Sequence, residues 1–194
     1  MFANRFTAVL DACVLASALK RNLLLSLGKS EFFRVRWSAR ILDETEAAIA
    51  KILKNDTNSN DRAQKHRAAM ERAFEDACIL DYDSLIPAVT GLPDPGDAHV
   101  IAAAVKTRAS VIVTDNLRHF PIDILFPLNL EARNADGFIA DTIDLDQARA
   151  VAAVKAMRLR LKKPELTPDE LLLRMEAASL TQSVDILRPH AESL

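Results

Sequence analysis

Glycine and aromatic residues are scarce in this sequence. Only 4 of the 194 residues are Gly and only 1 is Tyr, which argues against a turn-rich all-β protein. Ala and Leu are abundant and favour helices. Apolar residues make up 49% of the chain and are spread along its whole length. A chain of this size can bury an independent core, so we expect one domain, with or without a small appendage.

A strong net charge and a cysteine framework are also missing. The formal net charge is -2, so no overall basic field attracts nucleic acid, and any such binding must depend on local patches. The two cysteines, Cys13 and Cys78, fit no zinc spacing. A disulfide is not expected in a chain that can build a full core, and we expect both to be small buried apolar residues.

The sequence contains no long apolar run. Residues 1–10 are too short and too mixed for a signal peptide. No stretch approaches the roughly 18 uninterrupted apolar residues that a membrane-spanning helix needs. These absences predict a cytoplasmic protein that has no contact with a membrane.

Strands and helices alternate in the first two thirds of the chain. Residues 6–10 (FTAVL) and 110–114 (SVIVT) have the length and residue types of buried strands. Between them we expect helices over 14–27, from Ser38 onward and over 62–77. This order predicts an α/β domain with parallel strands.

The rest of the chain divides into a loop, a further helix and a helical tail. The stretch 91–97 (GLPDPGD) cannot be helical, and its Asp97 is placed to cap the helix that follows. From Asn134 onward no strand is expected, and helices begin at Asp144 and at Thr167, where Glu170 completes a capping box. We therefore predict an α/β domain over 1–130 and a helical extension over 131–194.

Acidic residues stand where a parallel sheet places its ligand site. Asp11 and Asp115 directly follow the two predicted strands, and Asp97 begins the helix that leads into the second one. Ligands bind at the carboxyl ends of such strands. Carboxylates crowded there need a cation, and Mg²⁺ or Mn²⁺ suits oxygen ligands and can activate water beside a phosphodiester. Each Asp could instead be a helix cap or a turn residue, and periodicity does not choose between Glu44 and Glu46.

Four segments together resemble the PIN-domain family. They are LDACVL (10–15), RILDETEAAI (40–49), GLPDPGDAHVIAAA (91–104) and VIVTDNLRHFP (111–121). The resemblance implies a PIN-like three-layer fold, with a central parallel sheet flanked by helices, and a metal-dependent endoribonuclease that uses Mg²⁺ or Mn²⁺.

The resemblance also assigns site residues. It implies metal ligands at Asp11, at Glu44 rather than Glu46, and at Asp97, with Asp94 as a weaker candidate. The fourth motif departs from the family pattern, because Asn116 stands where an Asp is usual and Asp115 falls one position earlier. Both are kept as catalytic candidates, and Asp115 as a metal ligand. The Thr114 hydroxyl could hydrogen-bond the cluster.

The tail adds a more specific likeness. Residues 164–172 (PELTPDELL) look like the C-terminal extension of VapC-type toxins, a bacterial PIN subgroup. This resemblance implies the toxin of a type II toxin–antitoxin pair, an RNA substrate such as tRNA or rRNA, a cognate VapB-like antitoxin and a homodimer.

Cationic side chains should surround an acidic site that receives RNA. Arg118, directly after the fourth motif, is the best candidate, and Lys20 and Arg21 are weaker ones. We expect a surface role for His119, and burial or a dimer contact for Trp37.

Two other functions are compatible with parts of the pattern. A catalytically inert PIN-fold module that binds RNA or protein would explain the unusual Asp115–Asn116 pair. A phosphohydrolase of the haloacid-dehalogenase type would need a second Asp where Cys13 stands, so the sequence argues against it.

Overall fold

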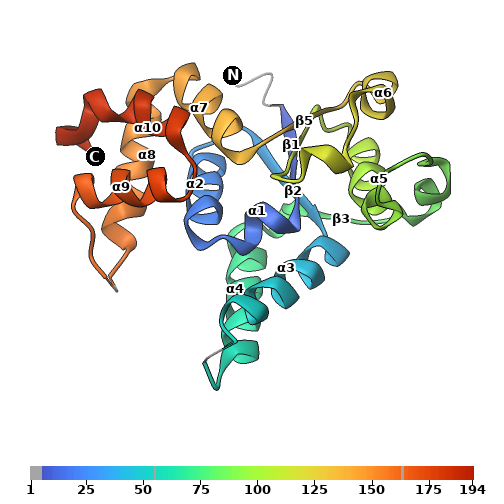
Figure 1. Cartoon of the computed structure of the whole chain (residues 1–194), viewed down its shortest axis with the longest axis horizontal. Coiled ribbons are helices and arrows are strands. Elements are labelled where there is room, and N and C mark those ends of the chain that lie inside the picture. The colour runs from blue at the N-terminus through green and yellow to red at the C-terminus, as the bar shows by residue number, and fades with distance from the viewer. Residues whose placement is uncertain (1–5, 55, 163) are drawn as a thin grey trace. The chain divides into compact units, whose positions relative to one another are not determined.

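The chain folds into two compact units. The computed structural model describes residues 6–54, 56–162 and 164–194 (Figure 1). The first unit comprises Met1–Ser17 and Arg34–Arg133, and the second comprises Ala18–Phe33 and Asn134–Leu194. The chain therefore leaves the first unit after α1 and returns to it at β2.

A parallel sheet forms the centre of the first unit. Its five strands pair in the order β3-β2-β1-β4-β5, and every pairing is parallel. The strands are β1 (Thr7–Leu10), β2 (Arg34–Ser38), β3 (Cys78–Ile79), β4 (Val111–Val113) and β5 (Glu131–Arg133). The predicted α/β fold with a central parallel sheet is confirmed.

Helices of the first unit pack on this sheet and on one another. They are α1 (Ala12–Ala16), α3 (Ala39–Ile52), α4 (Ser59–Ala73), α5 (Ala98–Lys106) and α6 (Ile122–Leu125). Helices α3 and α4 pack side by side (Figure 1). Helix α5 contacts β1, β2 and β4, and all its residues from Ala98 to Ala104 are buried. The acid-bearing loop before α5 is thus anchored by a helix that lies within the core.

Helices alone build the second unit. They are α2 (Ala18–Lys29), α7 (Ala135–Leu145), α8 (Gln147–Arg160), α9 (Pro168–Ala177) and α10 (Thr181–Leu187). Helix α2 packs on α7 and α8, and the rings of Phe33 and Phe138 meet edge to face at 4.9 Å. No strand occurs in the described part of residues 134–194, as predicted, and β5 (Glu131–Arg133) lies just before that range. The domain boundary near residue 130 stays a prediction, because α2 comes from the first third of the chain.

Local signals predicted several elements with small errors. The first strand and the strand before Asp115 lie where expected, and Ser38 caps α3 by accepting the Ile41 N–H at 3.2 Å. The helix expected over 14–27 is broken at Ser17, whose backbone is extended. The helix expected over 62–77 runs instead over Ser59–Ala73.

The two predicted caps of the tail have different outcomes. The capping box at the start of α9 is confirmed, with Glu170 N–H donating to Thr167 at 3.2 Å and Thr167 N–H donating to Glu170 at 2.8 Å. The cap expected at Asp144 is wrong. Asp146 caps α8 by accepting the Arg149 N–H at 3.1 Å, because α7 continues to Leu145 and takes Asp144 into its last turn.

The cysteines and the tryptophan can also be compared with expectation. Both cysteines are free, but Cys13 is half-buried and Cys78 is exposed, so the prediction that both are buried is wrong. Trp37 is fully buried and meets Phe74 edge to face at 5.8 Å, so its predicted burial is confirmed. Among the described residues, no helix combines the length and apolar character that a membrane crossing requires.

A buried carboxylate on α7 holds the first turn of α10. Asp136 accepts the backbone N–H groups of Gln182 and Ser183, each at 2.9 Å, and the Ser183 hydroxyl at 2.8 Å. Asp136→Ala would leave these donors without a partner, and we expect the free energy of unfolding to fall by about 2–3 kcal/mol. Urea unfolding followed by circular dichroism measures the loss. Asp185→Ala, an exposed change on α10, is the control, and equal stability of the two variants would contradict the prediction.

Candidate active site

Parallel pairing of β1 and β4 brings the first predicted acid into a hydrogen-bond network. Leu10 pairs with Val113, so Asp11 and Thr114 follow side by side at the carboxyl ends of their strands. The Thr114 hydroxyl donates to Oδ2 of Asp11 at 2.7 Å, and both residues are buried. The hydrogen bond predicted for Thr114 is therefore confirmed.

Cys13 connects the same carboxylate to the fourth motif. Its thiol donates to Oδ2 of Asp11 at 3.2 Å, and its sulfur accepts the Asp115 N–H at 3.2 Å. Burial and then the negative charge of Asp11 raise the pKa of Cys13 to about 12. The thiol therefore keeps its proton at neutral pH and remains a hydrogen-bond donor. Cys13 has a role at the site that the sequence did not indicate.

Asp11 keeps some capacity to bind a cation. Its Oδ1 accepts the N–H of Ala12 at 2.7 Å, and its Oδ2 accepts the two side-chain donors described above. A carboxylate oxygen can accept two hydrogen bonds. Oδ1 of Asp11 can therefore still coordinate an ion.

Asp97 has a different partner from the one expected. It stands at the N-cap position of α5, as predicted, but its side chain makes no cap hydrogen bond. Its Oδ2 instead lies 2.7 Å from Nδ1 of His119. Burial raises the pKa of Asp97, the His119 hydrogen bond opposes this, and the charges of Asp11 and Asp94 raise it further.

The closest possible set of metal ligands includes a histidine. Among the described residues, the ligand atoms of Asp94, Asp97 and His119 lie within 4.8 Å of one another, and this group does not include Asp11, Glu44 or Asp115. Asp94 also forms the predicted turn, since its Oδ1 accepts the Gly96 N–H at 2.8 Å. His119 is only 21% exposed, so the surface role expected for it is wrong. Its position just after the fourth motif was the signal available in the sequence.

Glu44 and Glu46 lie on different sides of α3. Oε1 of Glu44 lies 3.1 Å from Nε2 of His99 on α5 and 3.3 Å from Nε of Arg40. Glu46 instead pairs with Arg67 on α4 at 3.3 Å. Glu44 is therefore the acid that faces the helix beginning after Asp97, although periodicity could not distinguish the two.

Contacts with His99 and Arg40 also favour the ionised form of Glu44. Partial burial acts to raise its pKa, but His99 and Arg40 together outweigh burial, and the pKa lies below its usual value. Nη2 of Arg40 also donates to the Gly96 carbonyl at 3.3 Å. Arg40 thus links α3 to the loop that carries Asp97.

Asp115 and Asn116 are held at the site through their backbones. The Asp115 N–H donates to Cys13, and the Asn116 N–H donates to the Thr114 hydroxyl at 3.1 Å. Both residues are exposed. Which of the two side chains completes the site stays a prediction.

The three candidate RNA contacts are in different environments. Arg118 is exposed, and its Nε donates to Nε2 of His119 at 3.3 Å, beside Asp97. Lys20 and Arg21 belong to α2 in the second unit. Arg21 is 5% exposed, and burial lowers its pKa. Such burial argues against Arg21 as an RNA contact.

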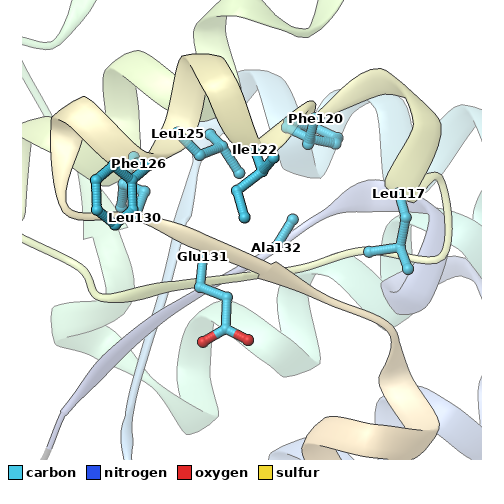
Figure 2. A pocket seen from close by; sticks show the side chains of 8 residues that line it. All are labelled: Leu117, Phe120, Ile122, Leu125, Phe126, Leu130, Glu131 and Ala132. Carbon is cyan, nitrogen blue, oxygen red and sulfur yellow. The ribbon is translucent and has the colours of Figure 1, made fainter.

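An apolar pocket of about 430 Å³ also lies on the first unit. Figure 2 shows its lining, in which the carboxylate of Glu131 points away from the apolar side chains of Leu125 and Phe126. Among the residues that the structure describes, Glu131 is the one ionisable residue in its lining, and none of the predicted site acids lines it. The pocket is therefore distinct from the acidic site.

The acidic residues fit a divalent cation. The possible ligand atoms of Asp94, Asp97 and His119 are carboxylate oxygens and one imidazole nitrogen, which suit Mg²⁺ or Mn²⁺. Burial first, and then the charges of Asp11 and Asp94, raise the pKa of Asp97, and a bound cation would favour its ionised form.

Comparisons with known proteins agree with this geometry. The family described as "PIN domain" matches residues 7–118, and "VapC50 C-terminal domain" matches residues 135–189. A curated protein of Mycobacterium tuberculosis (strain ATCC 25618 / H37Rv), "Putative ribonuclease VapC50", is 42% identical over 96 residues. The match covers 50% of this chain and 56% of the relative, so the chain spans little more than half of that protein's length. No solved structure matches the chain.

The raised pKa of Asp97 predicts how its replacement changes stability. A raised pKa means that folding disfavours the ionised carboxylate, so stability falls as the pH rises through the folded-state value. Asp97→Asn removes this cost. With EDTA at pH 7, we expect the variant to be at least as stable as the wild type in urea unfolding. The difference should shrink in acid, where the wild-type carboxyl is protonated.

The control for this prediction is Asp76→Asn, an exposed acid of the same unit. Its stability should match that of the wild type at both pH values. A clearly less stable Asp97→Asn protein at pH 7 would contradict the proposed charge repulsion.

Proposed function

The chain belongs to the PIN-domain family, and on this premise we propose that it is a metal-dependent endoribonuclease, the toxin of a type II toxin–antitoxin pair. The observation that carries the proposal is the gathering of Asp94, Asp97 and His119, whose possible ligand atoms lie within 4.8 Å of one another although they come from two separate motifs. The name of the curated relative, a ribonuclease, supports RNA as the substrate class.

We propose Asp11, Glu44 and Asp97 as ligands of one or two Mg²⁺ or Mn²⁺ ions, with Asp115 or Asn116 completing the set. A bound divalent cation would supply an activated water and compensate negative charge on the phosphate. The protein's own groups orient the acids. Thr114 and Cys13 hold Asp11, and His119 holds Asp97.

Substrate binding needs positive charge next to these acids. Arg118 is exposed and lies against His119, so its guanidinium can bind an RNA phosphate at the edge of the acidic site. We propose tRNA or rRNA as the substrate. A VapB-like antitoxin and a homodimer are proposed partners.

Purified protein incubated with total tRNA or rRNA should cleave it when Mg²⁺ or Mn²⁺ is present and not when EDTA is added. Asp97→Asn and Asp11→Asn should each reduce the cleavage rate at least about 100-fold, because each removes a negatively charged ligand. The rate is measured by gel electrophoresis of end-labelled RNA.

Asp76→Asn is the matched control and should cleave like the wild type. Cleavage that survives Asp97→Asn and Asp11→Asn would refute the proposed site. A wild-type protein that binds RNA but neither cleaves it nor binds either cation would favour the inert module, which the unusual Asp115–Asn116 pair keeps as the second candidate.

The same variants test the toxin assignment in cells. Expression of the wild type should arrest bacterial growth, and Asp97→Asn should abolish the arrest. Co-expression of a short reading frame next to this gene should also relieve it if that frame encodes the antitoxin. Growth arrest by Asp97→Asn would contradict the assignment.

The proposed homodimer has a candidate surface around the apolar pocket. Phe126 and Ile122 are 76% and 73% exposed at its edge, and exposed apolar groups of this size favour protein contacts. Phe126→Glu should convert the dimer to a monomer in sedimentation-velocity experiments. Leu173→Glu, at an apolar residue 62% exposed in the second unit, should remain dimeric. A dimeric Phe126→Glu protein, or a monomeric wild type, would refute this contact.

A further inference from the structure

A histidine occupies a fully buried position in α5, a helix made mostly of apolar residues. Helix α5 has the sequence AHVIAAAVK, and the side chain of His99 in its first turn has an exposed fraction of 0%. Burying an imidazole costs free energy unless a polar partner compensates. An apolar residue would meet the packing requirement at this position without that cost.

The polar contact that His99 does make is with a proposed metal ligand. Its Nε2 lies 3.1 Å from Oε1 of Glu44 on α3. Within the part of the chain that the structure describes, neither Nδ1 nor Nε2 makes a hydrogen bond of standard geometry, so the approach of Nε2 to Glu44 is a close polar contact. Other polar contacts therefore do not explain why a histidine stands at this position. The contact with Glu44 distinguishes His99 from the neighbouring core residues.

This contact restricts a side chain that lies partly at the surface. Glu44 is 40% exposed on a helix surface, and a glutamate there can adopt several rotamers. His99 and Arg40 both contact the same atom, Oε1. Within the described residues, Oε2 has no contact of this kind. One carboxylate oxygen is thus fixed by the protein, while the other stays available.

His99 also couples two acids that come from different helices. It stands two residues after Asp97, at the start of α5. The same turn that positions Asp97 therefore positions the imidazole that holds Glu44. Arg40 makes a second link, since it contacts Glu44 and donates to the carbonyl of Gly96 at 3.3 Å.

We propose that His99 is a positioning residue of the metal site, which fixes Oε1 of Glu44 so that Oε2 is presented to the cation. The inference rests on the proposed function, because it needs Glu44 to be a ligand. Groups that orient ligands in this way commonly change metal affinity or activity by 10- to 100-fold when they are replaced.

The test compares His99→Gln, His99→Leu and Val100→Ala. The Gln side chain can place an amide nitrogen near the position of the imidazole Nε2, whereas Leu fills the space without a polar group. Val100 is the adjacent residue of α5 and is fully buried, so its truncation disturbs the same helix without touching Glu44. Thermal unfolding of each variant with EDTA reports the purely structural effect.

Two readouts separate positioning from packing. Isothermal titration with Mn²⁺ and no RNA should give an affinity about 10-fold or more weaker for His99→Leu, with most of the loss recovered by His99→Gln. With saturating Mn²⁺, His99→Leu should lower kcat for RNA cleavage and leave KM nearly unchanged. Val100→Ala should be less stable and should bind Mn²⁺ like the wild type.

Wild-type Mn²⁺ affinity in His99→Leu would overturn the inference, and so would equal losses in all three variants. If the wild type cleaves RNA in a Mn²⁺-dependent manner and His99→Leu matches it, only the inference fails. If the wild type neither binds Mn²⁺ nor cleaves RNA, the proposed function fails as well.

Discussion

The hydrogen bond from Thr114 to Asp11 is the interaction on which the site depends. It joins the ends of β1 and β4 at 2.7 Å, and it forms only in the register that pairs Leu10 with Val113. A slip of one residue would turn Asp11 to the other face of the sheet. Because Asp11 is 5% exposed, its carboxylate requires donors. Thr114, Cys13 and the Ala12 N–H supply them, so an acid can be buried at the sheet edge without a permanent basic partner.

The three proposed acidic ligands are held in different ways, and the difference indicates where a cation contributes most. Neutral donors hold Asp11. Glu44 is paired with Arg40 and His99, and its pKa is lowered although burial opposes this. The pKa of Asp97 is raised by burial and by the charges of Asp11 and Asp94, despite the His119 hydrogen bond. A divalent ion bound at Asp97 would therefore favour the ionised carboxylate, which burial and the neighbouring charges disfavour.

Sequence patterns predicted the features that local chemistry determines. Strands β1 and β4, the Ser38 cap and the box at Thr167 all have local signals. Strands β2 (RVRWS), β3 (two residues) and β5 (EAR) were not predicted, because charged residues or short length hide them and pairing with neighbours stabilises them. At the site, motifs located Asp11 and Asp97. Periodicity could not separate Glu44 from Glu46, whereas the family resemblance favoured Glu44. In the structure Glu44 faces His99 and Glu46 faces Arg67.

The helical extension packs with a helix from the first third of the chain, which the order of the elements in the sequence does not indicate. Helix α2 lies between α1 and β2 in the chain, yet it packs with α7 and α8. Arg160 donates to Ser26 at 2.8 Å, and the Arg149 guanidinium lies 4.1 Å from the centre of the Phe32 ring. Without residues 134–194, these groups of 18–33 would lose their partners, and the segment joining Asp11 to β2 would lose its support. The extension therefore stabilises an insertion that directly follows the first acid of the site.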